Sequence, residues 1–330
     1  MRILVTGAAG FIGSSLCDYL KKQGHFIIGI DDLSYGRYDN LYNENKEFVV
    51  NHFAKEDITT DFYFPSDVDV VFHLAAIAPL PDCQSDPKKA YDVNVTGTVN
   101  VLEKAREAGV KKVIFASTNA VCENEYNNHY MLSLDSEPDL IYPMTKRAGE
   151  LLCSSYTKNY SMDVMVVRIS NVYGPSQDYL RKHPPLMGYI INCLKDNIQP
   201  TFYNTSSKRD YIYIKDLCSF FDHVMVMPSL SLTSYSATSG EVYDVPTIYS
   251  TFQEFFDSTI DPIYDNPKCL WDKYPELFRG KYGLRTERVH KEVMKNAIKI
   301  RKKWPANWKP QYSLLNGAKE IVDYVKKNIS

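Results

Sequence analysis

A glycine loop near the start of the chain most constrains what this sequence can fold into. Residues 2–6 (RILVT) form a short apolar run. Three glycines follow this run at a spacing of three: Gly7, Gly10 and Gly13. Three apolar residues then recur at helical spacing: Ile12, Leu16 and Leu20. A second apolar run at 26–30 ends in Asp31. This order predicts a strand, a tight turn, a helix and a second strand, which together form one βαβ unit.

The glycine loop suggests binding of a dinucleotide. A diphosphate at a helix N-terminus needs bare backbone N–H groups, here those of Phe11, Ile12 and Gly13, and gains from the partial positive charge there. Asp31 lies where a carboxylate can accept hydrogen bonds from an adenosine ribose. A carboxylate would repel the extra phosphate of NADP, so the sequence favours NAD. The alternative is an ordinary strand-to-helix turn.

Length and composition limit the class of protein. The 330 residues are enough for two domains, or for one large domain with a lobe, and the net charge of −2 gives no reason to expect a nucleic-acid or membrane partner. The sequence has no run of about 18 apolar residues and no secretory signal pattern. Its seven scattered cysteines fit a reduced, cytoplasmic protein. Without paired Cys or His spacings, no metal site is predicted.

Alternating strand and helix patterns predict an α/β fold with a Rossmann-type, doubly wound parallel sheet. Further strands are expected at 47–50, 69–74, 112–116 and 163–168, with long helices at 86–109 and from Tyr142. The predicted NAD-binding domain is 1–170, with residues 209–245 packing back on it. Residues 171–330 form a smaller α/β lobe for the substrate. Elements expected in this lobe are helices at 186–194, 251–260, 291–303 and after Ser313, and strands at 201–203, 208–214 and 242–245.

Several residues near strand ends are candidate cofactor contacts. Small residues after the fourth strand, in the sequence Leu74-Ala75-Ala76, would let a pyrophosphate or a nicotinamide ribose lie close. Asp57 and Ile58 would lie near the adenine, although a solvated loop aspartate fits Asp57 almost as well. Asn94 has two interpretations: a residue that bridges backbone groups beside the cofactor, or a polar residue on a helix face.

Tyr142 and Lys146 form the candidate catalytic pair. Residues i and i+4 share one face of a helix, so the two side chains should be neighbours. A phenol with an ordinary pKa of about 10 is a poor base at neutral pH, and an ammonium one turn away, added to the charge of oxidised NAD, would lower that pKa. Such a pair also arises by chance. The glycine loop, together with Thr118 at the end of the fifth strand, favours the catalytic interpretation, and the neighbouring Ser117 is a further candidate cofactor contact.

The chain resembles the extended short-chain dehydrogenase/reductases that act on nucleotide sugars, in particular the UDP-galactose 4-epimerase-like group. The resemblance covers nearly the whole chain. It rests on motifs in a specific order: GAAGFIG at 7–13, Asp31, HLAA at 73–76, NVTGT at 94–98, STNAV at 117–121, Tyr142-x-x-x-Lys146, RISNVYGP at 168–175, RDYIY at 209–213 and WKP at 308–310. The family implies that Tyr142 is the acid/base, that Lys146 holds the nicotinamide ribose and that Thr118 binds the reacting hydroxyl.

The family also implies contacts to the substrate. Asn171 and Arg209 correspond to residues that bind the substrate diphosphate, and a second arginine corresponds to Arg288, with Arg285 as the rival. Family members usually pair through helices into homodimers.

The resemblance implies an NAD-dependent epimerase acting on a nucleoside-diphosphate sugar, with 4-epimerisation of a UDP-sugar through a transient 4-keto sugar preferred. Dehydratases of the family carry Asp-Glu directly after the catalytic Thr, where this chain has Asn119-Ala120. Alternatives are 2-epimerisation, another oxidoreductase or dehydratase activity, and a non-catalytic NAD-binding regulatory protein.

Overall fold

The computed structural model describes residues 1–122, 140–175, 177, 184–203, 207–227, 234–265, 274–278, 283–285 and 304–328. These residues form two compact units, each built from separate stretches of the chain. Unit 1 comprises Met1–Ile169, Leu217–Ala237 and Lys303–Trp308, and unit 2 comprises Ser170–Asp216, Thr238–Lys302 and Lys309–Ser330. The predicted segment 209–245 is therefore divided between the two units. Among the described helices, none has the length and apolar character to cross a membrane.

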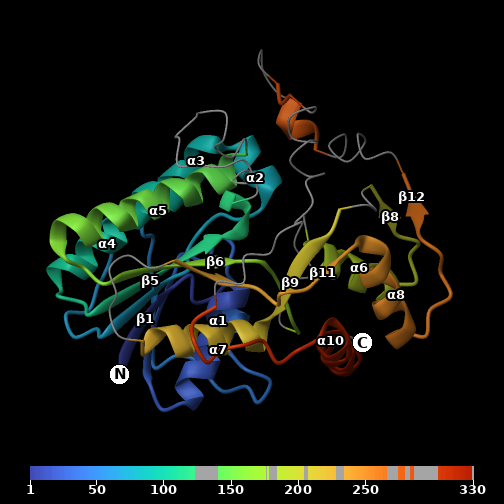
Figure 1. Cartoon of the computed structure of the whole chain (residues 1–330), viewed down its shortest axis with the longest axis horizontal. Coiled ribbons are helices and arrows are strands. Elements are labelled where there is room, and N and C mark those ends of the chain that lie inside the picture. The colour runs from blue at the N-terminus through green and yellow to red at the C-terminus, as the bar shows by residue number, and fades with distance from the viewer. Residues whose placement is uncertain are drawn as a thin grey trace. The chain divides into compact units, whose positions relative to one another are not determined.

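Unit 1 is built on a seven-stranded parallel sheet of order β10-β6-β5-β4-β1-β2-β3 (Figure 1). The strands are β1 (Arg2–Thr6), β2 (Phe26–Asp31), β3 (His52–Lys55), β4 (Val70–His73), β5 (Lys112–Thr118), β6 (Val164–Ile169) and β10 (Ser234–Ala237). The strand order reverses between β1 and β4, and ligands of such sheets bind beyond the strand ends at that point. The predicted α/β fold with a Rossmann-type parallel sheet is confirmed.

Helices cover both faces of this sheet. They are α1 (Phe11–Lys22), α4 (Gly97–Glu107), α5 (Ile141–Tyr160) and α7 (Ile214–Met225), and two short helices, α2 (Leu80–Ser85) and α3 (Pro87–Tyr91), pack against α5. Figure 1 shows α4 and α5 over one face, and α1 and α7 over the other. Apolar side chains of α4 and α5, among them Val101, Leu102 and Cys153, pack on the sheet residues Val71 and Phe115. Burial of these side chains removes apolar surface from water and is the main force holding the layers together.

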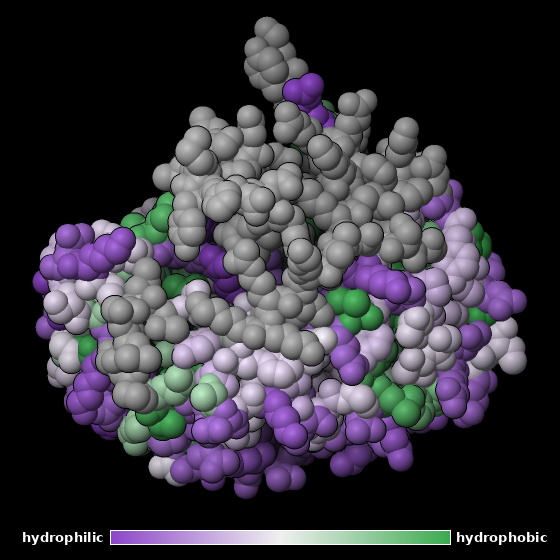
Figure 2. All heavy atoms as spheres, in the orientation of Figure 1, coloured by the Kyte–Doolittle hydropathy of each residue, from purple (hydrophilic) through white to green (hydrophobic). Residues whose placement is uncertain are grey.

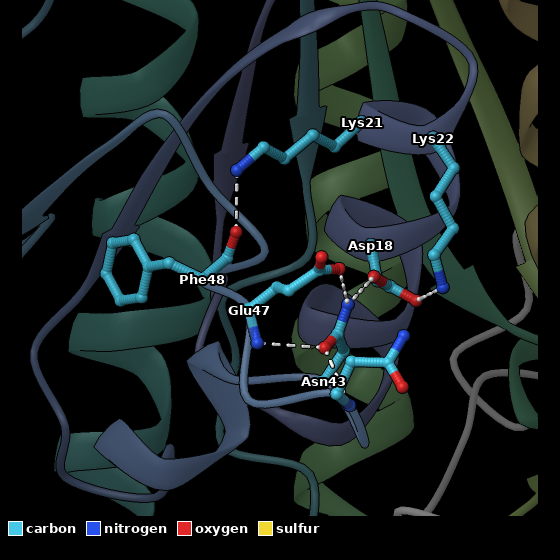
Figure 3. Close-up of polar contacts among 7 residues, drawn as sticks. Asp18, Lys21, Lys22, Asn43, Glu47 and Phe48 are labelled. Carbon is cyan, nitrogen blue, oxygen red and sulfur yellow. Dashed lines mark hydrogen bonds and ion pairs between the residues drawn. The ribbon is translucent and has the colours of Figure 1, made fainter.

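The strand predicted at 47–50 is wrong, because residues 42–50 form a loop held against α1 (Figure 3). The Lys21 ammonium donates hydrogen bonds to the carbonyls of Phe48, at 2.6 Å, and Val50, at 3.3 Å. The Asn43 side chain donates to Asp18 and to Glu47. The Lys21 ammonium thus binds backbone carbonyls that a strand would pair with a neighbouring strand. The third strand begins only at His52.

The predicted helix at 86–109 is interrupted. A π-helical turn at Asp92–Thr96 separates α3 from α4. The Thr98 hydroxyl donates to the Asn94 carbonyl at 2.7 Å, and this type of contact competes with regular helical hydrogen bonding. π-Helical turns of this kind often mark functional sites.

Unit 2 contains two small sheets. β9 (Arg209–Tyr213) pairs in parallel with β7 (Asn171–Tyr173) and antiparallel with β11 (Val242–Tyr243), and β8 (Thr201–Phe202) pairs with β12 (Ile263–Tyr264). In the described residues of this unit they are accompanied by helices α6 (Leu186–Lys195), α8 (Val245–Phe255) and α10 (Leu314–Asn328). The helix predicted at 251–260 was placed too late, because the Asp244 carboxylate accepts the Thr247 N–H and starts α8 at Val245. The helix predicted at 291–303 lies outside the described residues.

Asp210 organises the larger sheet of unit 2. Its carboxylate is 4% exposed and accepts hydrogen bonds from the Ser170 hydroxyl, from the N–H and hydroxyl of Ser239, and from the Gly240 N–H. Burial raises the pKa of this carboxyl, and the four hydrogen bonds oppose that rise. A buried carboxylate with this many donors joins the start of β7 to the turn before β11.

The face drawn in Figure 2 is mainly hydrophilic over its described residues, and its hydrophobic residues appear in small separate groups. Several large apolar side chains are nevertheless at least half exposed, including Leu151 and Tyr160 of α5. Scattered exposed apolar residues are normal, whereas a group on one helix can be part of an interface.

Gly149 sets how closely α5 approaches the sheet, and its replacement provides a test. A Cβ at this position would lie 2.4 Å from Cζ of the Phe115 ring. We expect Gly149→Ala to lower the free energy of unfolding. Overpacking costs roughly 1–3 kcal/mol, whereas the gain in helix propensity is at most about 1 kcal/mol.

Urea unfolding of Gly149→Ala, Phe115→Leu and the double variant measures this effect. The smaller side chain in Phe115→Leu makes room for the new methyl group, so the double variant should be more stable than the sum of the single changes predicts. Equal or greater stability of Gly149→Ala than of the wild type would contradict the close packing.

Candidate functional site

The glycine loop between β1 and α1 leaves no room for side chains. Gly7 has a φ of +74°, and a Cβ there would lie 2.8 Å from the Ala75 nitrogen. A Cβ on Gly13 would lie 2.0 Å from the Gly7 carbonyl oxygen. Both positions therefore require glycine: Gly7 for its backbone conformation and for its approach to the segment after β4, and Gly13 for the approach of α1 to the loop.

The N-terminus of α1 is suited to bind an anion. The N-cap residue of α1 is Gly10, which has no side chain to occupy the helix end, and the first turn of α1 contains no acidic residue. Within the described part of the chain, the N–H groups of Phe11, Ile12 and Gly13 meet no backbone or side-chain acceptor. Unsatisfied amides at the positive end of a helix dipole are the arrangement that a dinucleotide diphosphate needs. These residues therefore fit NAD.

Asp31 ends β2 beside this loop. The side chain is only 7% exposed, and its carboxylate accepts the Ala9 N–H at 3.0 Å and the Leu33 N–H at 2.9 Å. Burial raises the pKa of this carboxyl, while the two backbone donors act in the opposite direction. A Cβ on Gly36 would lie 2.6 Å from the carboxylate, so the chain folds closely over it. The Asp31 carboxylate, which the sequence predicts to contact the ribose, is thus held in one orientation, next to the loop expected to bind the diphosphate.

The other candidate cofactor residues surround the same strand ends. Asp57 is exposed and accepts the Thr59 N–H, while Ile58 is buried and its carbonyl accepts the Asn100 side chain. Three residues that are partly exposed follow β4: Leu74, Ala75 and Ala76. Leu74 and Ala75 are tied to Thr6 at the end of β1, through its carbonyl at 3.2 Å and its hydroxyl at 3.3 Å. The segment after β4 is thereby fixed against the glycine loop.

Tyr142 and Thr118 meet at the junction of α5 and β5. Tyr142 is the second residue of α5 and Thr118 is the last residue of β5, and the Thr118 side chain is close enough to the phenol to lower its pKa. The Thr145 hydroxyl donates to the Tyr142 carbonyl at 2.8 Å, which helps to fix the start of the helix. The structure therefore brings together the phenol and the hydroxyl that the sequence analysis had placed on separate elements.

Lys146 lies one helical turn further along α5. It is 3% exposed, and its ammonium donates to the Ala116 carbonyl at 2.9 Å and lies 5.0 Å from the centre of the Phe115 ring. Burial lowers the pKa of Lys146 to about 8. The lysine is therefore held by β5 on the side of the helix that carries Tyr142.

The chain's own groups do not lower the pKa of Tyr142, contrary to the expectation based on Lys146. Burial raises the pKa of this phenol, the nearby Cys83 thiol adds to the rise, and the Thr118 side chain opposes it. A positive charge close to the phenol, such as that of oxidised NAD, would lower this pKa.

Asn94 bridges backbone groups, as one of the two sequence interpretations predicted. It lies in the π-helical turn and is 1% exposed. Its Oδ1 accepts the Ile77 N–H at 2.8 Å, and its Nδ2 donates to the Ile77 carbonyl and to the Thr145 hydroxyl. Asn94 thus joins the segment after β4 to the first turn of α5.

Ser117 points away from Thr118, as neighbours in a strand do, and its hydroxyl donates to Glu150 at 2.6 Å. Glu150 is 6% exposed and accepts two hydrogen bonds from the Arg168 guanidinium, at 2.8 and 2.7 Å. The sequence analysis assigned Ser117 to the cofactor and did not identify Glu150. The sequence did contain a signal for Glu150. It follows Lys146 by four residues, as Lys146 follows Tyr142, so all three side chains lie on the side of α5 that faces β5.

The candidate substrate residues Asn171 and Arg209 belong to unit 2. They lie on the paired strands β7 and β9, where Asn171 is in register with Tyr211 and donates from Nδ2 to the Asp210 carbonyl at 3.0 Å. The Arg209 guanidinium donates to the Lys208 carbonyl at 3.1 Å. Arg288 lies outside the described residues, and its rival Arg285 is exposed.

The parallel sheet, the glycine turn and the Tyr-x-x-x-Lys pair define an α/β protein of the short-chain dehydrogenase/reductase type. The model of the NAD dependent epimerase/dehydratase family matches residues 3–237, and the chain belongs to this family.

Two relatives and one solved structure are similar over the full length. The chain is 31% identical to a UDP-glucose 4-epimerase of Mycolicibacterium smegmatis and 29% identical to a putative UDP-glucose 4-epimerase of Methanocaldococcus jannaschii, and each match covers 99% of both chains. The crystal structure of a Thermotoga maritima UDP-glucose 4-epimerase with UDP-glucose superimposes with a TM-score of 0.80 over 100% of both chains, at 24% identity. This structural likeness supports the fold.

The pKa of Lys146 predicts a pH dependence of stability. Between about pH 8 and 10.5 the unfolded lysine keeps its proton while the folded one loses it, so this group makes the folded state more stable as the pH rises. Relative to a Lys146→Met variant, the wild type should gain up to about 3 kcal/mol across this window.

Urea unfolding of both proteins at several pH values measures the difference. The exposed Lys158 of the same helix, replaced by Met, is the matched control and should keep the wild-type pH dependence. A constant difference between wild type and Lys146→Met from pH 7 to 10.5 would contradict the lowered pKa.

Proposed function

We propose that the protein is an NAD-dependent epimerase of nucleoside-diphosphate sugars, acting at C4 of a UDP-sugar. The observation that carries this proposal is the proximity of the Tyr142 phenol to the Thr118 hydroxyl, with Lys146 one turn away on α5. A phenol and a hydroxyl in this arrangement can bind a sugar hydroxyl and exchange its proton. The family membership and the names of the full-length relatives agree with this activity.

The chain's residues have distinct roles in this proposal. Bound NAD supplies a reversible acceptor for the hydrogen at C4. Tyr142 takes the proton of the 4-hydroxyl and later returns it, and Thr118 orients that hydroxyl through its own hydrogen bond. Lys146 binds the nicotinamide ribose and places its positive charge near the phenolate. Oxidation at C4 gives a 4-keto sugar, and reduction on the opposite face completes the epimerisation without net redox change.

The substrate is proposed from the relatives and from unit 2. Asn171 and Arg209 would bind the diphosphate, since an arginine fork matches phosphate oxygens. The residues after Thr118 favour an epimerase over a 4,6-dehydratase, because loss of water needs an acid and a base where this chain has Asn119 and Ala120. The Ala120 N–H donates to the Thr118 hydroxyl at 3.3 Å, and its methyl group cannot transfer a proton. The cytoplasm remains the predicted location.

Replacement of Tyr142 by Phe tests the proposed chemistry. We expect turnover to fall by roughly 10²–10⁴-fold, because the proton acceptor is lost. Binding of NAD should be retained. The matched control is Tyr156→Phe, which removes a phenol of the same helix that donates to Glu103 instead.

NMR of incubations with UDP-, GDP-, CDP- and dTDP-sugars identifies both the substrate and the carbon that is inverted. Formation of a C2 epimer would favour 2-epimerisation, and loss of water would favour a dehydratase. A Tyr142→Phe variant with the wild-type rate would refute the assigned role. NAD binding by the wild type without conversion of any sugar in the panel would favour a regulatory protein.

We propose that the protein forms a homodimer through α4 and α5, which lie side by side in unit 1 (Figure 1). Leu151 and Tyr160 of α5 are 54% and 53% exposed, which is unusual for large side chains on a helix that packs on a sheet. We expect Leu151→Glu to shift the mass measured by light scattering from dimer to monomer. The equally exposed Ile198→Glu in unit 2 is the control and should remain a dimer. A wild-type monomer would contradict the proposal.

A further inference from the structure

A buried histidine joins the end of β1 to the π-helical turn before α4. His73 is the last residue of β4 and is 1% exposed. Its Nδ1 lies 2.7 Å from the Thr6 hydroxyl, and its Nε2 lies 3.0 Å from the Thr98 hydroxyl. Both threonines are buried, at 0% and 1% exposure. None of the roles proposed above for Tyr142, Thr118 and Lys146 involves His73.

The hydrogen bonds around His73 determine which ring nitrogen carries the proton. Thr98 gives its single hydroxyl proton to the Asn94 carbonyl, so it can only accept from His73. Nε2 is therefore the donor, and Nδ1 accepts the proton of Thr6. The Thr6 oxygen in turn accepts the Ala75 N–H. One neutral tautomer of the imidazole, with its proton on Nε2, satisfies every donor and acceptor in this series of hydrogen bonds.

The surroundings of His73 keep it neutral. Burial, together with the charge of Lys146, lowers the pKa of its imidazole to about 3. The Phe115 ring lies against both, with its centre 5.7 Å from that of the His73 ring and 5.0 Å from the Lys146 ammonium. A neutral imidazole places a donor and an acceptor beside Lys146 without adding a second positive charge.

The chain of hydrogen bonds continues from His73 to the catalytic tyrosine. Thr98 holds the main chain of Asn94, whose side chain binds Ile77 and the Thr145 hydroxyl. Thr145 then donates to the Tyr142 carbonyl. A change at His73 would therefore be transmitted to the first turn of α5 through three buried side chains, those of Thr98, Asn94 and Thr145.

We propose that His73 is a positioning residue: through Thr98 it holds the π-helical turn at Asn94, and through Asn94 it places Tyr142 for proton transfer. This inference rests on the proposed function, since Tyr142 is taken as the acid/base. The important contact is the one from Nε2 to Thr98, because only that side leads to Asn94. The contact from Nδ1 to Thr6 belongs to the glycine loop.

Two variants of His73 separate these two contacts. In His73→Gln the side-chain amide nitrogen can take the place of Nε2 and donate to Thr98, whereas in His73→Asn the amide oxygen can take the place of Nδ1 and accept from Thr6. We expect His73→Asn to lower kcat by roughly 10²-fold with an unchanged KM, since a misplacement of about 1 Å has an effect of this size. His73→Gln should retain most of the wild-type kcat.

A second pair of variants tests the same link if His73→Asn does not fold. Thr98→Val removes the hydroxyl between His73 and Asn94, and Thr98→Ser keeps it. Thr98→Val should lower kcat, and Thr98→Ser should not. The proposal is overturned if His73→Gln is as impaired as His73→Asn, if Thr98→Val keeps the wild-type kcat, or if the loss of activity only follows the fraction of unfolded protein.

Amide hydrogen exchange gives a measurement that needs no substrate. His73→Asn should speed exchange in peptides covering 92–98 and 140–146, and His73→Gln should leave these peptides protected. A wild type that binds NAD but converts no sugar would refute the proposed function, while the exchange pattern would still test the link. Equal protection in both His73 variants would overturn the inference, whatever the activity.

Discussion

The close contact between α5 and β5 is the interaction on which the rest of the site depends. Two side chains on one face of α5, four residues apart, bind β5: Lys146 donates to the Ala116 carbonyl, and Glu150 accepts from the Ser117 hydroxyl. Gly149 lies on the same side and leaves room for the Phe115 ring. The helix cannot move along or away from the strand without breaking several of these contacts at once. A change in the packing of unit 1 would therefore also move the candidate catalytic side chains.

The sequence predicted this arrangement where its patterns are local. The glycine loop, the strands β1 and β2 and the pair Tyr142 and Lys146 each follow from spacing within about thirty residues. Helix α6 was predicted almost to the residue, since Pro185 precedes an apolar segment with clear helical periodicity. The family resemblance supplied the roles of Thr118 and Arg209, which no local pattern reveals.

The remaining features depend on partners that are far apart in the sequence. Lys21 draws residues 48 and 50 into a loop, although these residues alone have the composition of a strand. The π-helical turn arises from the Thr98 and Asn94 contacts, which helical periodicity does not record. Glu150 has the sequence appearance of a surface residue, and donors that reach it from β5 and β6, the Ser117 hydroxyl and the Arg168 guanidinium, make its burial favourable. Strand β10 lies too far from β6 along the chain to be paired with it by any local signal.

The discontinuous composition of unit 1 has a consequence for biosynthesis. When the ribosome has completed residues 1–169, six of the seven strands of the parallel sheet exist, but β6 still has an open edge where β10 will pair. The Phe72 ring likewise lacks the Phe221 ring that packs against it at 5.4 Å. An open edge and uncovered apolar side chains favour association with other chains. The strand edge and the apolar side chains are covered only when residues 217–237 have been made, so the last strand of the sheet sets the time at which this risk of association ends.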